Sequence, residues 1–180
     1  MTGIESLPKS IKLVVFDVEG VLLRVRVPSP FAGGGYMLYE AVRRKGLISF
    51  IQFLLLGLFY TLRLISTETA VRRAFKLLRG LDRGVFQEIF DGLMLGPGLV
   101  RTFSELNRLG IRIALVSYGL PSFLLHSLMQ RIGAQYAYGV ELEMEDGKAT
   151  GEISGIMSRK DGKLLALNEI CRLEGISPEE

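Results

Sequence analysis

Cysteine is almost absent from this sequence, which has a single one, Cys171, among 180 residues. One cysteine excludes an internal disulfide, and its position in a helical pattern predicts a buried thiol. The segment Met1–Ser10 has no long apolar region behind a basic stretch, so the sequence predicts no secretory signal. These absences favour a reducing, cytoplasmic location.

Long runs of basic charge are also missing. The net charge is +3, and the one run of three basic residues is Arg43-Arg44-Lys45, which we interpret as a solvated helix end. Because no basic stripe is interleaved with aromatic residues, we expect no nucleic-acid partner. The small positive excess instead favours an anionic small molecule or a membrane surface.

Apolar residues, by contrast, are plentiful. They make up 48% of the chain, and the mean hydropathy is +0.31. This composition excludes disorder for most of the chain and predicts a substantial core. A length of 180 residues fits one domain, or a compact domain that carries an inserted subdomain.

The order of the predicted elements is typical of an α/β fold. Two runs rich in β-branched and other apolar residues, 11–16 and 111–116, predict buried strands. An amphipathic segment at 98–109 stops at Gly110, directly before the second run, as a helix of a parallel α/β unit would. Further elements are expected as a helix at 121–131, a β-hairpin at 138–153 with its turn at Asp146-Gly147, and a helix at 162–173.

Residues 28–95 differ in character, because they lack strand alternation and predict helices. We interpret them as a helical cap inserted into an α/β core made of residues 1–27 and 96–180. Gly33-Gly34-Gly35, near the start of the cap, is not followed by Lys-Ser or Lys-Thr and does not follow a strand. It therefore favours a hinge or a helix entry over a phosphate loop.

Within the predicted cap, Gly46–Leu62 forms an uncharged apolar run of 17 residues. Spanning a bilayer usually takes about 20 apolar residues. We expect a helix buried within the cap. The alternative is a helix that lies in a membrane surface, flanked by Arg43–Lys45 and Arg63.

Two carboxylates follow the first predicted strand. Asp17 comes directly after it, and Glu19 lies two residues further along. Ligands of open α/β sheets bind at the carboxyl ends of strands, and residues two apart in an extended backbone point the same way. One carboxylate can attack or bind a metal ion while the other transfers a proton. Taken alone, the pair also fits an ordinary acidic strand-to-loop junction.

Three further positions suit a phosphate group. Ser117 ends the second buried strand, and the backbone amides near Gly119 suit phosphate oxygens. Lys163, at the start of the last helix, can neutralise phosphate charge. Each has a simpler alternative on its own, since Ser117 fits a helix N-cap and Lys163 a surface lysine.

Together, these residues resemble the haloacid dehalogenase superfamily of phosphohydrolases, and within it the phosphoserine phosphatase-like branch. The shared plan is a strand-end Asp-x-Asp, a helical cap, a strand-end Ser or Thr and a helix-borne Lys. The resemblance covers nearly the whole chain, including the Pro97-Gly98 helix entry and the hairpin at 141–151. It implies a Rossmann-like parallel sheet with the cap inserted after the first strand.

The resemblance also implies a role for each of these residues. Asp17 would be the nucleophile and a Mg²⁺ ligand. Glu19 would be the general acid/base, and its backbone carbonyl would bind the metal ion. Ser117, Gly119 and Lys163 would hold the phosphoryl group. Mg²⁺ prefers such oxygen ligands, and phosphoryl transfer depends on positioning and charge neutralisation.

The sequence departs from the resembled pattern in several places. Glu19 stands where most members have Asp. Arg26 stands where phosphoserine phosphatases keep a glutamate for the substrate amine, and their cap arginine falls on Ala74, with Arg73 adjacent. An acidic phosphoester is therefore at least as good a candidate as phosphoserine. The fourth motif of the family, an acidic strand end, is expected beyond Glu180, so we interpret the C-terminal part of the core as missing.

The sequence thus predicts a Mg²⁺-dependent phosphomonoester hydrolase that forms an aspartyl-phosphate intermediate with a small phosphorylated metabolite. The alternatives are a phosphotransferase, and a non-catalytic or membrane-associated module that retains the fold.

Overall fold

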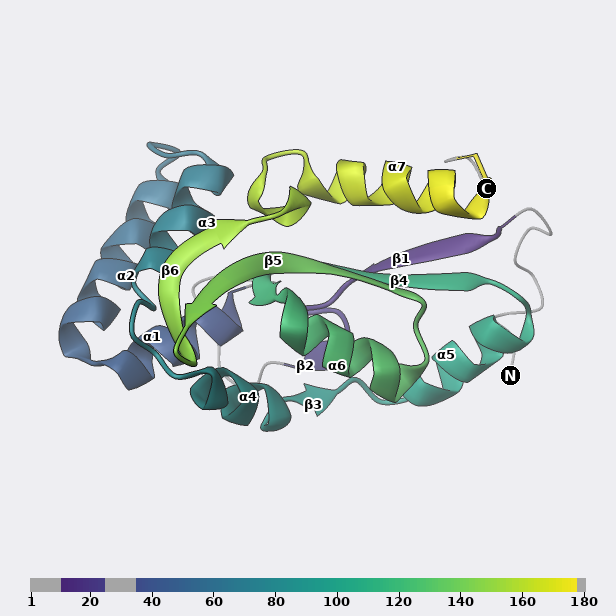
Figure 1. Ribbon diagram of the computed structural model, residues 1–180, viewed down its shortest axis with the longest axis horizontal. Helices are drawn as coiled ribbons and strands as arrows, with labels where there is room; N and C mark the ends of the chain where they lie inside the picture. The colour runs from purple at the N-terminus through teal and green to yellow at the C-terminus, as the bar shows by residue number, and fades with distance from the viewer. Residues whose placement is uncertain (1–10, 25–34, 178–180) are drawn as a thin grey trace.

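The computed structural model describes residues 11–24 and 35–177, and its centre is a four-stranded sheet in the order β1-β4-β5-β6 (Figure 1). The strands are β1 (Leu13–Asp17), β4 (Arg112–Pro121), β5 (Tyr136–Glu145) and β6 (Lys148–Ser154). β4 is parallel to both β1 and β5, whereas β6 runs antiparallel to β5. The α/β fold with a parallel sheet core that the sequence predicts is confirmed.

Helices cover both faces of the sheet (Figure 1). α5 (Leu99–Arg108) and α6 (Ser122–Ile132) lie on one face, and α7 (Gly162–Glu174) lies on the other. α5 buries Leu99, Phe103 and Leu106, at the spacing of one helix face. The ring centroid of Phe103 lies 4.9 Å from that of Phe16 in β1. Cys171 is buried in α7, as predicted.

β4 is longer than the sequence indicates. The prediction ends this strand near Val116, but the structure continues it to Pro121, with a register shift against β5 between these two residues. Ser117, expected at a strand end, therefore lies inside the irregular part of β4. It is not an N-cap either, since Pro121 holds that position of α6. The prediction missed this extension because an irregular strand loses the pattern of a regular ladder.

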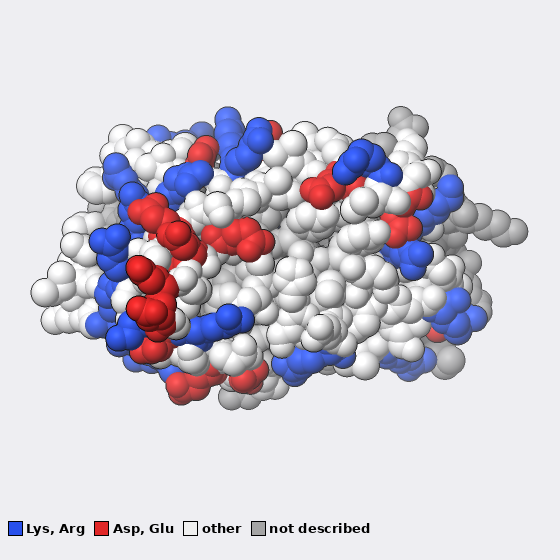
Figure 2. Space-filling view, in the orientation of Figure 1, with Lys and Arg blue, Asp and Glu red and all other residues white. Residues whose placement is uncertain are grey.

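β5 and β6 form the predicted hairpin. Its turn residues, Asp146 and Gly147, have φ values of 49° and 77°, the left-handed conformation that two-residue hairpin turns require. Glu145 and Lys148 pair directly beside the turn. Figure 2 shows acidic side chains gathered over this hairpin, with basic side chains beside them.

Between β1 and α5 the described residues form four helices and a short two-stranded antiparallel ribbon. These elements are β2 (Leu23–Arg24), α1 (Tyr36–Lys45), α2 (Leu47–Thr61), α3 (Thr67–Lys76), α4 (Arg83–Asp91) and β3 (Met94–Leu95). β2 and β3 pair antiparallel, so the outgoing and returning segments lie side by side. Gly35, at φ 84°, is the N-cap of α1, while Gly33 and Gly34 lie outside the described residues.

The apolar helix α2 is only partly enclosed, which corrects the expectation of a helix buried within the cap. Its buried residues are Phe53, Leu56 and Gly57. Large apolar side chains are exposed along its other side and at its ends: Leu47, Ile48, Ile51, Leu54, Leu55, Leu58, Phe59 and Leu62. Among the described residues, only one side of α2 contacts other parts of the protein. A run that is apolar on every side does not reveal which side this is. None of the helices within residues 11–24 and 35–177 has the length and hydropathy needed to cross a bilayer.

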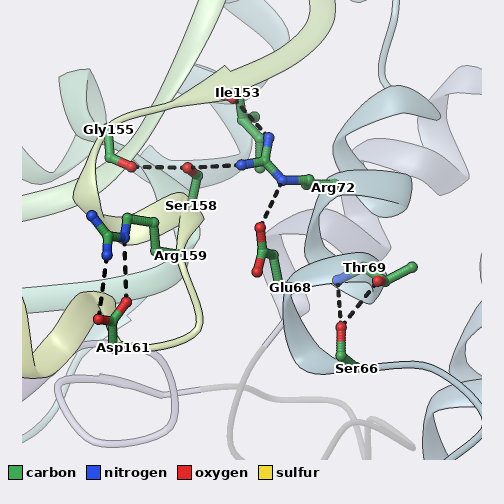
Figure 3. Close-up of polar contacts among 9 residues, drawn as sticks. All are labelled: Ser66, Glu68, Thr69, Arg72, Ile153, Gly155, Ser158, Arg159 and Asp161. Carbon is green, nitrogen blue, oxygen red and sulfur yellow. Dashed lines mark hydrogen bonds and ion pairs between the residues drawn. The ribbon is translucent and has the colours of Figure 1, made fainter.

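α3 and the residues after it are attached to the hairpin. Backbone hydrogen bonds run from Gly80 N–H to the Ala149 carbonyl and from Ala149 N–H to the Leu81 carbonyl, at 2.7 and 2.9 Å. The Arg72 guanidinium donates to the Ile153 carbonyl and to Ser158 Oγ, and it also pairs with Glu68 (Figure 3). These contacts fix one wall of the space between the helices and the sheet.

Candidate active site

Asp17 is the last residue of β1 and lies beside Val116 of β4. Its Oδ1 accepts a hydrogen bond from Val18 N–H at 3.0 Å. Its Oδ2 lies 3.1 Å from Lys163 Nζ, and the side chains of both residues are about 40% exposed, at 42% and 39%. The carboxylate is therefore held in one orientation, yet it remains accessible to a ligand.

Glu19 occupies a very different environment, since it is only 5% exposed. Its Oε1 accepts a hydrogen bond of 3.2 Å from Met37 N–H in the first turn of α1. Burial away from water raises the pKa of Glu19, while backbone hydrogen bonds from Gly35 and Met37 act in the opposite direction. Glu19 thus connects the end of β1 to the start of α1, and its protonated form is favoured compared with an exposed glutamate.

Gly119 provides the space that Glu19 occupies. A Cβ atom at position 119 would lie 2.0 Å from Glu19 Oε2 and 3.0 Å from its Cδ, so no side chain fits there without movement. From the sequence, Gly119 was expected to bind phosphate through nearby amides, and its steric role beside Glu19 was not predicted. Contact between positions a hundred residues apart gives no local sequence signal.

Ser117 lies at the buried end of the site, at 1% exposure. Its Oγ accepts a hydrogen bond of 3.2 Å from Gly119 N–H. This bond fixes the serine side chain within the irregular part of β4. The hydroxyl hydrogen is not used in that bond and can be donated to an anion.

Tyr118 holds the segment that carries Lys163. Its hydroxyl donates to the Lys160 carbonyl at 3.0 Å and accepts from Lys163 N–H at 3.3 Å. Lys163 Nζ also lies 5.3 Å from the centre of the Tyr118 ring, within the range of a cation–π contact. Tyr118 stands between Ser117 and Gly119 in the sequence, yet no role was predicted for it.

A single cavity of about 460 Å³ joins these residues. All five predicted site residues line one end of it: Asp17, Glu19, Ser117, Gly119 and Lys163. The other end lies among α1, α2 and α3. The structure therefore brings the predicted residues together, with carboxylate, hydroxyl and ammonium groups in one cleft beside an apolar chamber.

A family model described as haloacid dehalogenase-like hydrolase matches residues 14–180. The chain belongs to this family. It is 30% identical over 173 residues to the phosphoserine phosphatase of Archaeoglobus fulgidus, covering 93% of this chain and 45% of that protein. It is 27% identical over 116 residues to the phosphoserine phosphatase of Methanocaldococcus jannaschii, covering 64% of this chain and 54% of that one. The predicted phosphoserine phosphatase-like branch is confirmed, and the chain spans about half the length of these relatives.

Solved structures share the fold of this haloacid dehalogenase-like chain. A phospho-aspartyl intermediate analogue of phosphoserine phosphatase has a TM-score of 0.75 at 22% identity, covering 93% of this chain and 74% of that one. A family hydrolase from Salmonella enterica has a TM-score of 0.79 at 19% identity, covering 96% and 55%. These similarities extend over the sheet and the inserted helices alike.

Proposed function

We propose that this protein is a Mg²⁺-dependent phosphomonoester hydrolase that acts on a small phosphorylated molecule through an aspartyl-phosphate intermediate. The observation that carries the proposal is the 3.1 Å pair of Asp17 Oδ2 and Lys163 Nζ, which lines a cavity together with Glu19 and Ser117. A phosphoryl group bound there would meet a nucleophile, a cation and a hydroxyl donor. In keeping with this function, we propose that residues 28–95 form a cap over a core made of residues 1–27 and 96–180.

In the proposed reaction, an Asp17 oxygen attacks phosphorus, and the bond from phosphorus to the leaving-group oxygen breaks. Glu19 gives its proton to that oxygen, so the product leaves as an alcohol. Glu19 then takes a proton from a water molecule whose oxygen attacks phosphorus. The bond from phosphorus to the Asp17 oxygen breaks, which restores the Asp17 carboxylate and releases inorganic phosphate. Burial raises the pKa of Glu19, and this supports its proton-donating role in the first step.

Lys163, Ser117 and Gly119 would position the phosphoryl group in this reaction. The Lys163 ammonium would neutralise charge on the phosphoryl oxygens, and Ser117 Oγ would donate a hydrogen bond to one of them. Lys163 also restrains Asp17, because the two side chains pair in the structure. Gly119 leaves room for Glu19 beside the reacting group.

The residues at this site suit Mg²⁺, which binds through one or two carboxylates and keeps several waters when a substrate phosphate is present. Asp17 and the backbone carbonyl of Glu19 would hold the ion. Within residues 11–24 and 35–177, no group of three His, Cys, Asp or Glu side chains is placed to hold a metal ion. When bound, Mg²⁺ would supply positive charge next to the phosphoryl oxygens.

Replacing the proposed nucleophile tests this function. In the full-length protein with Mg²⁺, Asp17→Asn should reduce hydrolysis of an aryl phosphate by several orders of magnitude, because the amide cannot form the intermediate. Asp91→Asn, an exposed substitution on α4, is the matched control and should retain activity. Near-normal turnover by Asp17→Asn would show that the covalent mechanism is wrong.

The exposed side of α2 favours a second function, association with a membrane surface. Its apolar side chains form a stripe along the helix, and the exposed cations Lys45 and Arg63 flank its two ends. This pattern is typical of helices that lie in an anionic lipid surface, with apolar residues among the acyl chains and basic residues at the headgroups. We therefore propose that α2 docks on anionic membranes.

Sedimentation with liposomes tests this docking. The protein should pellet with vesicles that contain phosphatidylglycerol, and the double variant Ile48→Glu/Leu58→Glu should remain in the supernatant. Leu164→Glu, at a residue of α7 that is 58% exposed, provides a control of similar exposure on another helix. If the wild-type protein stays in the supernatant, or if the double variant pellets as the wild type does, α2 does not bind membranes.

A further inference from the structure

The end of the cavity away from Asp17 is apolar. Leu38 of α1, Phe53 and Leu56 of α2, and Val71 and Ala74 of α3 all line it. The charged residues lining the described cavity, Asp17, Glu19 and Lys163, all lie at the opposite end. A bound phosphomonoester would therefore place its phosphate among charges and its alcohol part among hydrocarbon side chains.

The hydroxyl groups in this apolar part already take part in hydrogen bonds within the protein. Thr61 Oγ1 donates to the Gly57 carbonyl at 2.9 Å, and Tyr60 Oη lies 3.4 Å from Thr67 Oγ1. A polar substrate group would have to compete with these bonds. Apolar surface needs no such exchange, and its burial is favourable in proportion to its area.

The arginines of α3 do not supply a charge to this part of the cavity. The Arg72 guanidinium is directed toward Ile153 and Ser158 and pairs with Glu68 (Figure 3). Arg73 is exposed and is not among the residues that line the cavity. Ala74, where the resembled phosphatases have a substrate-binding arginine, presents only a methyl group and is 4% exposed.

A substrate whose alcohol part carries a charge would bind unfavourably at this site. Phosphoserine carries an ammonium and a carboxylate, and each would lose its hydration without an opposite charge from the described lining residues. A phosphoester that carries one carboxylate would lose the hydration of that charge in the same way. An aliphatic chain carries no charge and so loses no such hydration. The cavity, at about 460 Å³, is within the size range of small-molecule sites.

We propose, on the basis of the phosphatase function proposed above, that the substrate is a phosphate monoester of an apolar aliphatic alcohol. The phosphate binds between Lys163 and Ser117, and the aliphatic chain extends between α2 and α3 toward Phe53 and Val71. The cavity selects the substrate by apolar contact with its chain, and the described lining of its apolar part offers no charge that would recognise an amino-acid group.

A homologous series of substrates tests this selection in the full-length protein. We expect kcat/KM to rise from ethyl to butyl to hexyl phosphate by up to about fourfold for each buried methylene. The best alkyl phosphate should exceed phosphoserine and phosphoglycolate by about 100-fold or more, because unpaired buried charge is strongly rejected. Phosphate release is measured for every compound, with an aryl phosphate as the general probe of phosphatase activity.

A variant that shortens the cavity gives a sharper readout. Ala70 lines the apolar part and is only partly buried, so Ala70→Leu adds bulk at a tolerant position. It should lower kcat/KM for hexyl phosphate about tenfold more than kcat/KM for ethyl phosphate, because only the longer chain reaches the filled space. Arg73→Leu, on the same helix but outside the lining, is the control and should keep the wild-type dependence on chain length.

Binding of alkyl phosphonates, which are not hydrolysed, separates the two proposals. Calorimetry should show affinity increasing with chain length, and less so in Ala70→Leu. If the aryl phosphate is not hydrolysed while phosphonate affinity still follows chain length, the phosphatase proposal fails and the apolar cavity stands. If phosphonate affinity is independent of chain length, or phosphoserine is the preferred substrate, the inference of an aliphatic substrate is wrong.

Discussion

At the scale of single residues, Gly119 and Glu19 lie close together in the site. The glutamate side chain is one methylene longer than the aspartate that is usual in the resembled family. A Cβ at position 119 would meet Glu19 Oε2 at 2.0 Å. Because Gly119 has no side chain, the longer side chain of Glu19 fits beside it.

Adding one methyl group tests this fit. Gly119→Ala should destabilise the protein by about 1–3 kcal/mol, because overpacking forces Glu19 or β4 to move. Glu19→Asp in the same chain should recover part of that loss, since the shorter side chain draws back. Stability is measured as the free energy of unfolding in urea.

Gly84→Ala is the control for this pair of variants. A Cβ at position 84 meets no atom within 4 Å, and α4 includes this residue. Alanine there should be neutral or slightly stabilising. Equal stability of Gly119→Ala and Gly84→Ala would contradict the close packing inferred at the site.

At the scale of elements, the start of α7 is positioned by a tyrosine of β4. Tyr118 Oη receives Lys163 N–H and donates to the Lys160 carbonyl, so one hydroxyl fixes the backbone on both sides of the helix start. α7 otherwise lies on the face of the sheet opposite α5 and α6 (Figure 1). The position of Lys163 thus depends on a side chain from another element.

Removing this hydroxyl should loosen Lys163 while leaving the Tyr118 ring in place. We expect Tyr118→Phe to weaken binding of inorganic phosphate by about three- to tenfold, consistent with the loss of hydrogen bonds worth about 0.5–1.5 kcal/mol each. Tyr39→Phe, on α1 and outside the cavity lining, should bind phosphate as the wild type does. Unchanged phosphate affinity in Tyr118→Phe would show that the hydroxyl does not position Lys163.

At the scale of the whole molecule, Glu19 couples the sheet to the inserted helices, and its protonation should affect folding as a whole. Burial raises the pKa of Glu19 in the folded protein above its usual value of 4.5. The folded state therefore binds more protons than the unfolded state at pH values between 4.5 and the raised pKa. Stability must fall as pH rises through that window, by at most about 1.4 kcal/mol per pH unit from this residue.

Replacing the carboxylic acid with its amide should remove this contribution. Glu19→Gln keeps an oxygen that accepts from Met37 N–H, so its stability relative to the wild type should increase with pH across the window and then level off. Glu145→Gln, at an exposed glutamate of the hairpin, is the control. Urea unfolding at a series of pH values provides the measurement. A constant difference between Glu19→Gln and the wild type would exclude this linkage.

The sequence by itself determined the α/β fold and the group of residues that meet in one cavity. Strand and helix patterns depend on neighbouring residues, and the carboxyl ends of parallel strands meet at one edge of the sheet. Asp17 was expected at this edge, and the resemblance to the haloacid dehalogenase family implied that Ser117 and Lys163 would join it in one site. The hairpin was equally predictable, because its turn requires the left-handed conformation that Asp146-Gly147 adopts readily.

Only the tertiary structure decided which side of α2 is exposed, how Glu19 fits against Gly119, and where the Arg72 guanidinium lies. Each depends on contact between residues distant in the sequence, such as Arg72 with Ser158 and Gly119 with Glu19. A run that is apolar all round, such as α2, has no periodic signal to mark its covered side. Tertiary packing determines which side of α2 is covered. The covered side lines the apolar part of the cavity, and the other side forms the exposed apolar stripe.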